Sequence, residues 1–236
     1  MGQQHLARLA APAFWQLARK EHKWTLRPRS GTHALEASLP LGVVIRDMLG
    51  LAHTAKELKW ILNQGSVLVD KVVRKDPHFA IGFMDVLEFP QLQQTYRVVL
   101  DYHGQFVLLP VPAAEMESKL LKVIGKTMLR KKQLQFTLSD GRNLLDPKQK
   151  MNVGDTVHFH LGKKAVQEVL PVEPGMLAYF IDGTHQGTLG VVKAILRGKD
   201  LQEPKISAEQ NGVTFITSLR YVLIVGKQKP LLTLTP

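Results

Sequence analysis

The stretch Leu41–Leu87 reads LGVVIRDMLGLAHTAKELKWILNQGSVLVDKVVRKDPHFAIGFMDVL. Its first ten residues place apolar side chains at helical spacing, and Gly50 stands where a left-handed residue would end a helix. Thr54 and Glu57 follow with the spacing of a capping box, in which each side chain bonds the backbone of the other residue. The pattern therefore predicts two short helices, the second running from Thr54 to about Asn63.

Two short β-patterns, SVLVD and VVRKD, follow the second helix and meet at Asp70-Lys71. A compact helix pair joined to a hairpin offers a rigid surface, which suits recognition of RNA by shape and by phosphate contacts. An ordinary solvated helix face is the alternative, because five acidic residues nearly balance six basic ones in this stretch. The expected RNA-binding residues here are Arg46, Lys56, Lys59, Asn63, Lys71, Arg74 and Lys75.

The composition of the whole chain points the same way. The 236 residues carry a net charge of +11, and the pI near 9.8 is typical of nucleic-acid-binding proteins. Without cysteine, the chain has no disulfide, no cysteine-based zinc finger and no thiol catalysis. Its longest apolar runs are far shorter than the ~18–20 residues that a membrane helix needs, so we expect no membrane partner.

Residues 1–40 form a basic N-terminal arm with no sustained helical or strand period. Basic and aromatic residues alternate in it, a pattern that suits RNA backbone and exposed bases. We expect the arm to be extended and to become ordered on RNA, although packing of Trp15 and Trp24 on the protein's own body is an alternative. The expected RNA contacts in the arm are Arg8, Arg19, Lys20, Lys23, Arg27 and Arg29.

The remainder of the chain is rich in β-patterns. A turn at His103-Gly104 separates two apolar runs, and Asp140-Gly141 is a hairpin signal. Ala113–Ile124 is the one segment in residues 88–170 that we expect to be helical. Short strand patterns with glycine turns after Gly175 suggest a small barrel. The expected fold class is therefore α+β and β-rich.

Several of these segments resemble a known family. Leu41–Leu87 looks like the αL RNA-binding motif of ribosomal proteins, pseudouridine synthases and some tRNA synthetases. HLARLAAPAFWQLARKEHKW (His5–Trp24), SDGRN (Ser139–Asn143) and GMLAYFIDGTHQGTLGVV (Gly175–Val192) resemble, in order, segments of the fourth small-subunit ribosomal protein family of the archaeal and eukaryotic set. The chain is identified as a member of that family, and its length and lack of cysteine favour an archaeal source.

The resemblance implies a domain order and a function. We expect a basic arm (1–40), an αL RNA-binding domain (41–89), a central β-barrel-like domain (90–172) and a C-terminal SH3-like KOW barrel with a final strand (173–236). The implied function is structural: the protein binds small-subunit ribosomal RNA, with Arg142 of SDGRN as a further contact, and meets neighbouring small-subunit ribosomal proteins in the cytoplasmic ribosome. No enzymatic activity, cofactor or small-molecule substrate is expected.

Two positions depart from the family pattern, and alternatives stay open. Lys71 stands where the hairpin usually has glycine, so the turn is expected to adopt another type, because a left-handed non-glycine residue costs about 1–2 kcal/mol. Thr188 replaces the usual basic residue of the KOW loop.

His158 and His160 share a strand face, but no third metal ligand is evident. The rivals are a transiently bound KOW or αL factor and an αL-guided RNA-modifying enzyme.

Overall fold

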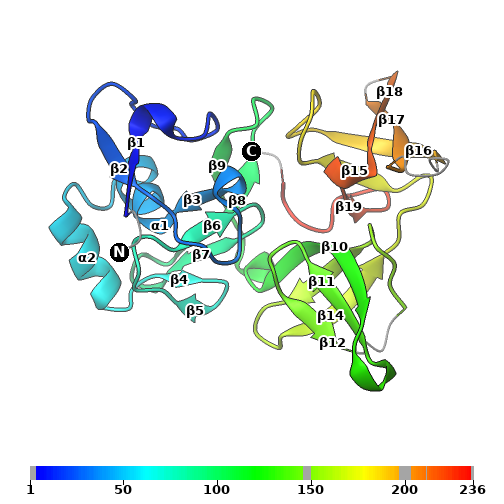
Figure 1. Ribbon diagram of the computed structural model, residues 1–236, viewed down its shortest axis with the longest axis horizontal. Coiled ribbons are helices and arrows are strands. Elements are labelled where there is room, and N and C mark those ends of the chain that lie inside the picture. Colours follow the sequence, from blue (N-terminus) through cyan, green and yellow to red (C-terminus); the bar gives the residue numbers. More distant parts are fainter. Residues whose placement is uncertain (1–3, 146–149, 197–202, 211, 235–236) are drawn as a thin grey trace. The chain divides into compact units, whose positions relative to one another are not determined.

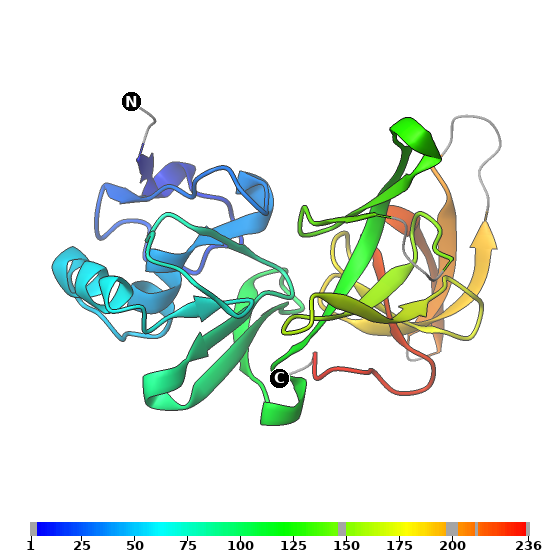
Figure 2. The ribbon, with the colours of Figure 1, turned by 90° about the horizontal axis from the view of Figure 1, so that it is seen from below.

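The computed structural model describes residues 4–145, 150–196, 203–210 and 212–234. The chain divides into two compact units (Figures 1 and 2). Unit 1 consists of Met1–Val99 and Gln105–Glu117, and unit 2 of Leu100–Gly104 and Ser118–Pro236. The protein is β-rich with few helices, as the sequence predicts.

In its described residues, unit 1 contains two α-helices and three small β-sheets. The five-stranded sheet has the order β5-β4-β7-β8-β9, and the pairs β1-β2 and β3-β6 complete the unit. The helices are α1 (Leu41–Val43), extended by a π-helical turn at Val44–Met48, and α2 (Ala55–Asn63). The strands are β1 (His5–Ala7), β2 (Trp24–Leu26), β3 (Ser38–Pro40), β4 (Leu68–Val69), β5 (Val72–Val73), β6 (Ala80–Gly82), β7 (Val86–Phe89), β8 (Gln94–Leu100) and β9 (Phe106–Pro110).

The start of α2 confirms the predicted capping box. The Thr54 hydroxyl accepts a hydrogen bond from the Glu57 backbone N–H at 3.2 Å, and the Glu57 carboxylate accepts from the Thr54 N–H at 3.3 Å. The backbone N–H groups of His53 and Thr54 lower the pKa of the Glu57 carboxyl. Leu58 and Leu62 are buried, so the opposite face of α2 points to solvent.

The β4-β5 hairpin has a left-handed turn in spite of its side chains. Asp70 and Lys71 have φ values of 51° and 65°, so the expectation that Lys71 would force another turn type is wrong. Two contacts offset the cost of this conformation. Asp70 Oδ1 accepts a hydrogen bond from the Val86 N–H at 3.1 Å, and Lys71 Nζ donates to Glu88 Oε2 at 3.1 Å.

The N-terminal arm is folded into unit 1, which corrects the expectation of an extended segment. The Trp15 side chain is 2% exposed, and its indole N–H donates to the Ser38 carbonyl at 3.0 Å. Strand β2 lies against α1, and β3 pairs with β6. The arm lacks periodicity because its order comes from single long-range contacts such as this tryptophan. The alternative that the arm packs on the protein's own body is therefore confirmed for Trp15.

The described part of unit 2 holds two five-stranded antiparallel sheets. The central sheet has the order β12-β11-β10-β13-β14, and the C-terminal sheet has the order β18-β17-β16-β15-β19. The central strands are β10 (Ser118–Met128), β11 (Leu134–Leu138), β12 (Asn143–Leu145), β13 (Thr156–His160) and β14 (Ala165–Leu170). The C-terminal strands are β15 (Leu177–Phe180), β16 (Leu189–Leu196), β17 (Lys205–Gln210), β18 (Val213–Ser218) and β19 (Val222–Gly226).

Strand β10 replaces the helix expected at Ala113–Ile124, and that prediction is wrong. Only Ala113–Glu115 is helical, as a single 3₁₀ turn. Residues 119–123 of β10 are all buried, because one sheet face packs on the unit's core and the other is also covered. A strand buried on both faces loses its period of two, and this run, which includes the buried Lys119 and Lys122, shows no strand pattern in the sequence.

Lys122 ties β10 to the C-terminal sheet. Its ammonium donates to the backbone carbonyls of Leu219, Arg220 and Val222 at 2.5, 3.1 and 2.6 Å. Burial lowers the pKa of Lys122 to about 8. A second link runs from the Ile224 N–H to the Thr156 hydroxyl at 3.0 Å. These bonds join the two sheets of unit 2 through polar groups that lie in the interior.

Candidate nucleic-acid interface

The outer face of α2 gathers most of the exposed basic residues expected in this region. Leu58 and Leu62 are buried, which leaves the opposite side of the helix open to solvent (Figure 1). Positions three and four residues apart share a helix face. The exposed residues of α2 are Ala55, Lys56, Glu57, Lys59, Trp60 and Asn63. Lys56 and Asn63 each lie three or four residues from both Lys59 and Trp60. Trp60 is absent from the set expected from the sequence, which was chosen for charge and hydrogen bonding.

The hairpin residues divide by their contacts. Lys75 is exposed. The Arg74 guanidinium lies 4.2 Å from the centre of the Phe79 ring, which holds it in place beside the hairpin. Lys71 Nζ lies 3.0 Å from a Glu88 carboxylate oxygen and 3.6 Å from one of Glu117. Lys75 is therefore open to solvent and Arg74 is half-buried beside Phe79, whereas the charge of Lys71 is neutralised within unit 1.

Two arginines of the arm serve the fold. Arg8 is 4% exposed, and its guanidinium donates to the Ala18 carbonyl at 2.7 Å. Arg19 donates to the carbonyls of Ala11 and Pro12 at 2.8 and 2.7 Å. Both side chains stabilise the folded arm. Their guanidinium groups bind the protein's own backbone, whereas the sequence predicts that they contact RNA.

The other arm cations lie nearer the surface. Lys20, Lys23 and Arg29 are exposed. The Lys23 ammonium lies 5.1 Å from the Trp24 ring centre, and Arg29 forms an ion pair with Asp76 at 2.8 Å. Arg46 pairs with its neighbour Asp47, also at 2.8 Å. The arm thus adds positive charge to unit 1, part of it already paired.

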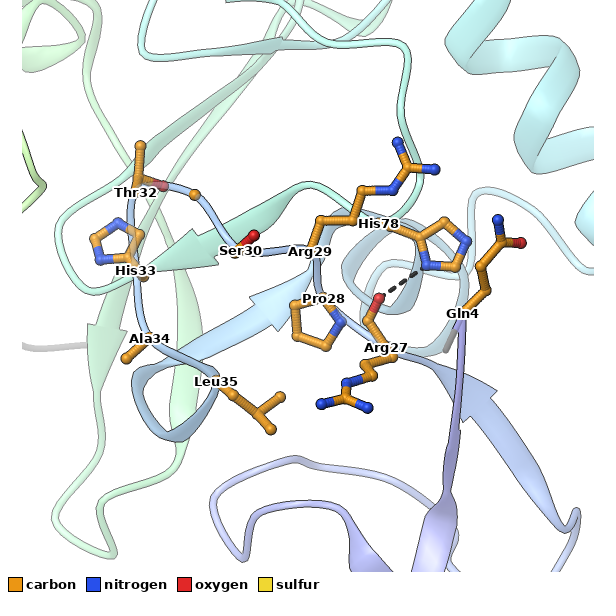
Figure 3. Close-up of a pocket in the computed structure, with 11 residues that line it drawn as sticks. Gln4, Arg27, Pro28, Arg29, Ser30, Thr32, His33, Ala34, Leu35 and His78 are labelled. Carbon is orange, nitrogen blue, oxygen red and sulfur yellow. Dashed lines mark hydrogen bonds between the residues drawn. The ribbon is translucent and has the colours of Figure 1, made fainter. Parts of the chain in front are cut away.

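A pocket of about 910 Å³ lies in unit 1 between residues 27–35, Gln4 and His78 (Figure 3). The His78 Nδ1–H donates to the Arg27 carbonyl at 2.8 Å, since a carbonyl can only accept. The Arg27 and Arg29 side chains leave the backbone on different sides in this view. An open hollow lined by arginine and histidine suits a phosphate group.

Unit 2 places its candidate residues differently. Arg142 Nε donates to the buried Asp140 carboxylate at 2.9 Å, and its guanidinium lies 5.2 Å from the Phe159 ring centre. The Thr188 hydroxyl donates to the His185 carbonyl at 2.7 Å. Both side chains are therefore engaged within unit 2.

Two negative findings concern other kinds of site. Within the described ranges, no cluster of three or more histidine or acidic residues could hold a metal ion. No helix in that part of the chain is long and apolar enough to cross a membrane.

Comparisons with known proteins agree with the β-rich fold. The model of the ribosomal family S4e matches residues 92–166, and the RS4NT domain model matches residues 1–36. The small ribosomal subunit protein eS4 of Methanosphaera stadtmanae is 36% identical over 98% of this chain and 95% of its own length. The eS4 protein of Methanocaldococcus jannaschii is also 36% identical, over 98% of this chain and 97% of its own.

A solved structure is similar as well. The crystal structure of the 30S ribosomal protein S4e from Thermoplasma acidophilum superposes with a TM-score of 0.70 at 30% identity. The match covers 81% of this chain and 96% of that one. Since nearly the whole chain aligns with these archaeal relatives, this protein belongs to the ribosomal S4e family.

Proposed function

We propose that this chain is a structural constituent of the small ribosomal subunit, where it binds ribosomal RNA and neighbouring ribosomal proteins and stabilises the RNA fold. The observation that carries the proposal is the near full-length similarity to proteins named as small ribosomal subunit protein eS4. The net charge of +11 supports it, because phosphate neutralisation supplies much of the affinity of RNA-binding proteins. The protein would then reside in the ribosomes of the cytoplasm and would not be an enzyme.

We further propose that the αL domain (41–89) supplies the main RNA surface and that the glycine-rich loop of 183–187 belongs to a KOW barrel. The capped α2 and the adjoining hairpin support the first part, because they display cations on a rigid scaffold. The engaged hydroxyl of Thr188 supports a KOW loop that serves the fold of unit 2. The proposed phosphate contacts are Lys56, Lys59, Arg74 and Lys75.

Alanine substitution tests the phosphate contacts. Replacing Lys56, Lys59, Arg74 or Lys75 should weaken binding to small-subunit ribosomal RNA and reduce the salt slope by about 0.7–0.9 per lost contact. The measurement is the dependence of the binding constant on salt concentration, taken for each variant in the full chain. The Lys71→Ala variant should change the slope less, since Lys71 is paired with Glu88.

Charge-preserving variants provide the matched control. Lys56→Arg and Lys59→Arg keep the positive charge at the same helix positions, so they should retain the wild-type slope. If all four alanine variants bind with the wild-type slope, α2 and its hairpin do not contact phosphates, and the RNA surface lies elsewhere on the chain.

A further inference from the structure

Trp60 lies in the middle of the exposed face of α2. Its side chain is 64% exposed. Lys56 stands one turn before it and Asn63 stands three residues after it, so all three share the face opposite the buried Leu58 and Leu62. Within the described residues, no other ring stacks on Trp60 and its indole N–H has no hydrogen-bond partner.

The fold does not account for a tryptophan at this position. An exposed indole contributes little hydrophobic stabilisation to the fold. Tryptophan also forms helices less readily than lysine or alanine. The other tryptophans have partners in unit 1. The Trp15 indole donates to Ser38, and the Trp24 ring lies beneath the Lys23 ammonium. Trp60 alone of the three presents a flat apolar surface with no such partner.

The neighbours of Trp60 define the chemistry of its partner. Lys56 lies one turn before Trp60, Lys59 is its neighbour in the sequence, and both are exposed. Glu57 is exposed nearby as well, but its carboxylate accepts hydrogen bonds from the backbone N–H groups of His53 and Thr54. A ligand attracted by the two lysines therefore carries negative charge close to a flat apolar group. An RNA nucleotide combines a phosphate with a base that can stack on an aromatic ring. The bases of a regular RNA helix are already stacked on one another, so only an unpaired base offers an open face.

We propose that Trp60 stacks on an unpaired base of the RNA, while Lys56 and Lys59 contact the adjoining phosphates. This inference rests on the proposed RNA-binding function and adds to it the kind of RNA element that α2 recognises, namely a loop, bulge or end. Stacking would give α2 a preference for unpaired nucleotides that charge alone cannot provide.

The test compares Trp60→Ala and Trp60→Tyr in the full chain. The probes are small-subunit ribosomal RNA transcribed in vitro and a fully paired RNA duplex. Trp60→Ala should bind the ribosomal RNA about 5- to 150-fold more weakly, the range that corresponds to the loss of one stacked base. Trp60→Tyr should restore most of the affinity, because tyrosine keeps an aromatic face. Binding to the duplex should be the same for all three proteins.

The salt dependence separates stacking from charge. Trp60→Ala should keep the wild-type salt slope, whereas Lys59→Ala should lower it. Thermal melting should be unchanged in Trp60→Ala, since the side chain is exposed.

Three results would overturn the inference. The first is an unchanged affinity of Trp60→Ala for the ribosomal RNA. The second is a salt slope of Trp60→Ala that falls as far as that of Lys59→Ala. The third is a Trp60→Ala variant that binds RNA normally but enters subunits poorly, which would mean that Trp60 contacts a neighbouring protein. If the wild-type protein itself shows no affinity for the ribosomal RNA, the proposed function fails instead.

Discussion

Replacing Gly187 with alanine is expected to destabilise unit 2 by several kcal/mol. Gly187 has a φ of 75°, and a left-handed alanine costs about 1–2 kcal/mol. The added Cβ would also overlap the Asp101 carbonyl group and stand 2.7 Å from the Tyr102 nitrogen. These are backbone atoms, so the loop at 100–104 would have to move.

That movement would strain a second contact. The buried Tyr179 hydroxyl donates to the Leu100 carbonyl at 2.7 Å, and burial raises the pKa of this phenol. Displacing the 100–104 loop would therefore weaken this buried hydrogen bond between Tyr179 and Leu100. Hydrogen exchange of the β15 and β19 amides measures the loss, while tryptophan fluorescence reports on unit 1, which holds all three tryptophans.

Gly175→Ala is the matched control. Gly175 also has a left-handed φ, 88°, but a Cβ there would meet no atom within 4 Å. It should therefore show only the conformational cost of about 1–2 kcal/mol. Equal destabilisation by Gly187→Ala and Gly175→Ala would mean that the approach to Asp101 is not close in the folded protein.

Replacing Lys122 with methionine should cost about 3–5 kcal/mol, because the carbonyls of Leu219, Arg220 and Val222 lose their shared donor in the interior of unit 2. Methionine keeps most of the length of the side chain, so the loss reflects the ammonium rather than a cavity. Hydrogen exchange of β10 and β19 amides follows the weakened link between the two sheets. Lys126→Met, an exposed position on the same strand, should cost less than about 1 kcal/mol. Similar values for the two variants would contradict the role of Lys122.

The pH dependence gives Lys122 a separate signature. Burial lowers the pKa of Lys122 to about 8 in the folded protein, whereas an unfolded lysine titrates near pH ~10.4. Between these values the unfolded chain binds more protons, so the Lys122 contribution makes stability rise with pH from about 8 to about 10. Lys122→Met should flatten that rise, and an unchanged pH profile would argue against a depressed pKa.

Local signals in the sequence predict the parts of the candidate surface that depend on neighbouring residues. The capping box of Thr54 and Glu57 locates the start of α2, and the structure confirms it. The hairpin at Asp70-Lys71 and the β8-β9 pair are also found where their patterns indicate. These elements are set by contacts between residues close in the chain, which is why a single sequence reveals them.

Contacts between residues that are far apart in the chain cannot be predicted from a single sequence in this way. Arg8 and Arg19 count as free cations in the sequence, but carbonyls that only the folded arm brings near bind both guanidinium groups. Lys71 is neutralised by Glu88, seventeen residues away in the chain. Trp60 is not among the residues expected from the sequence, because that set rests on charge and hydrogen-bonding groups. Its place on the polar side of α2, opposite Leu58 and Leu62, is a signal that helical periodicity could have revealed.

The central claim is that this protein is an integral part of the small ribosomal subunit. The most direct test is sedimentation of a tagged full-length chain in lysate of the source organism, followed by a high-salt wash of the isolated particles. We expect the chain to remain with the small subunit after the wash, at about one copy per particle, because many RNA contacts distributed over the chain resist screening together. Release of the chain to the top of the gradient would contradict the claim and would identify a transiently bound factor.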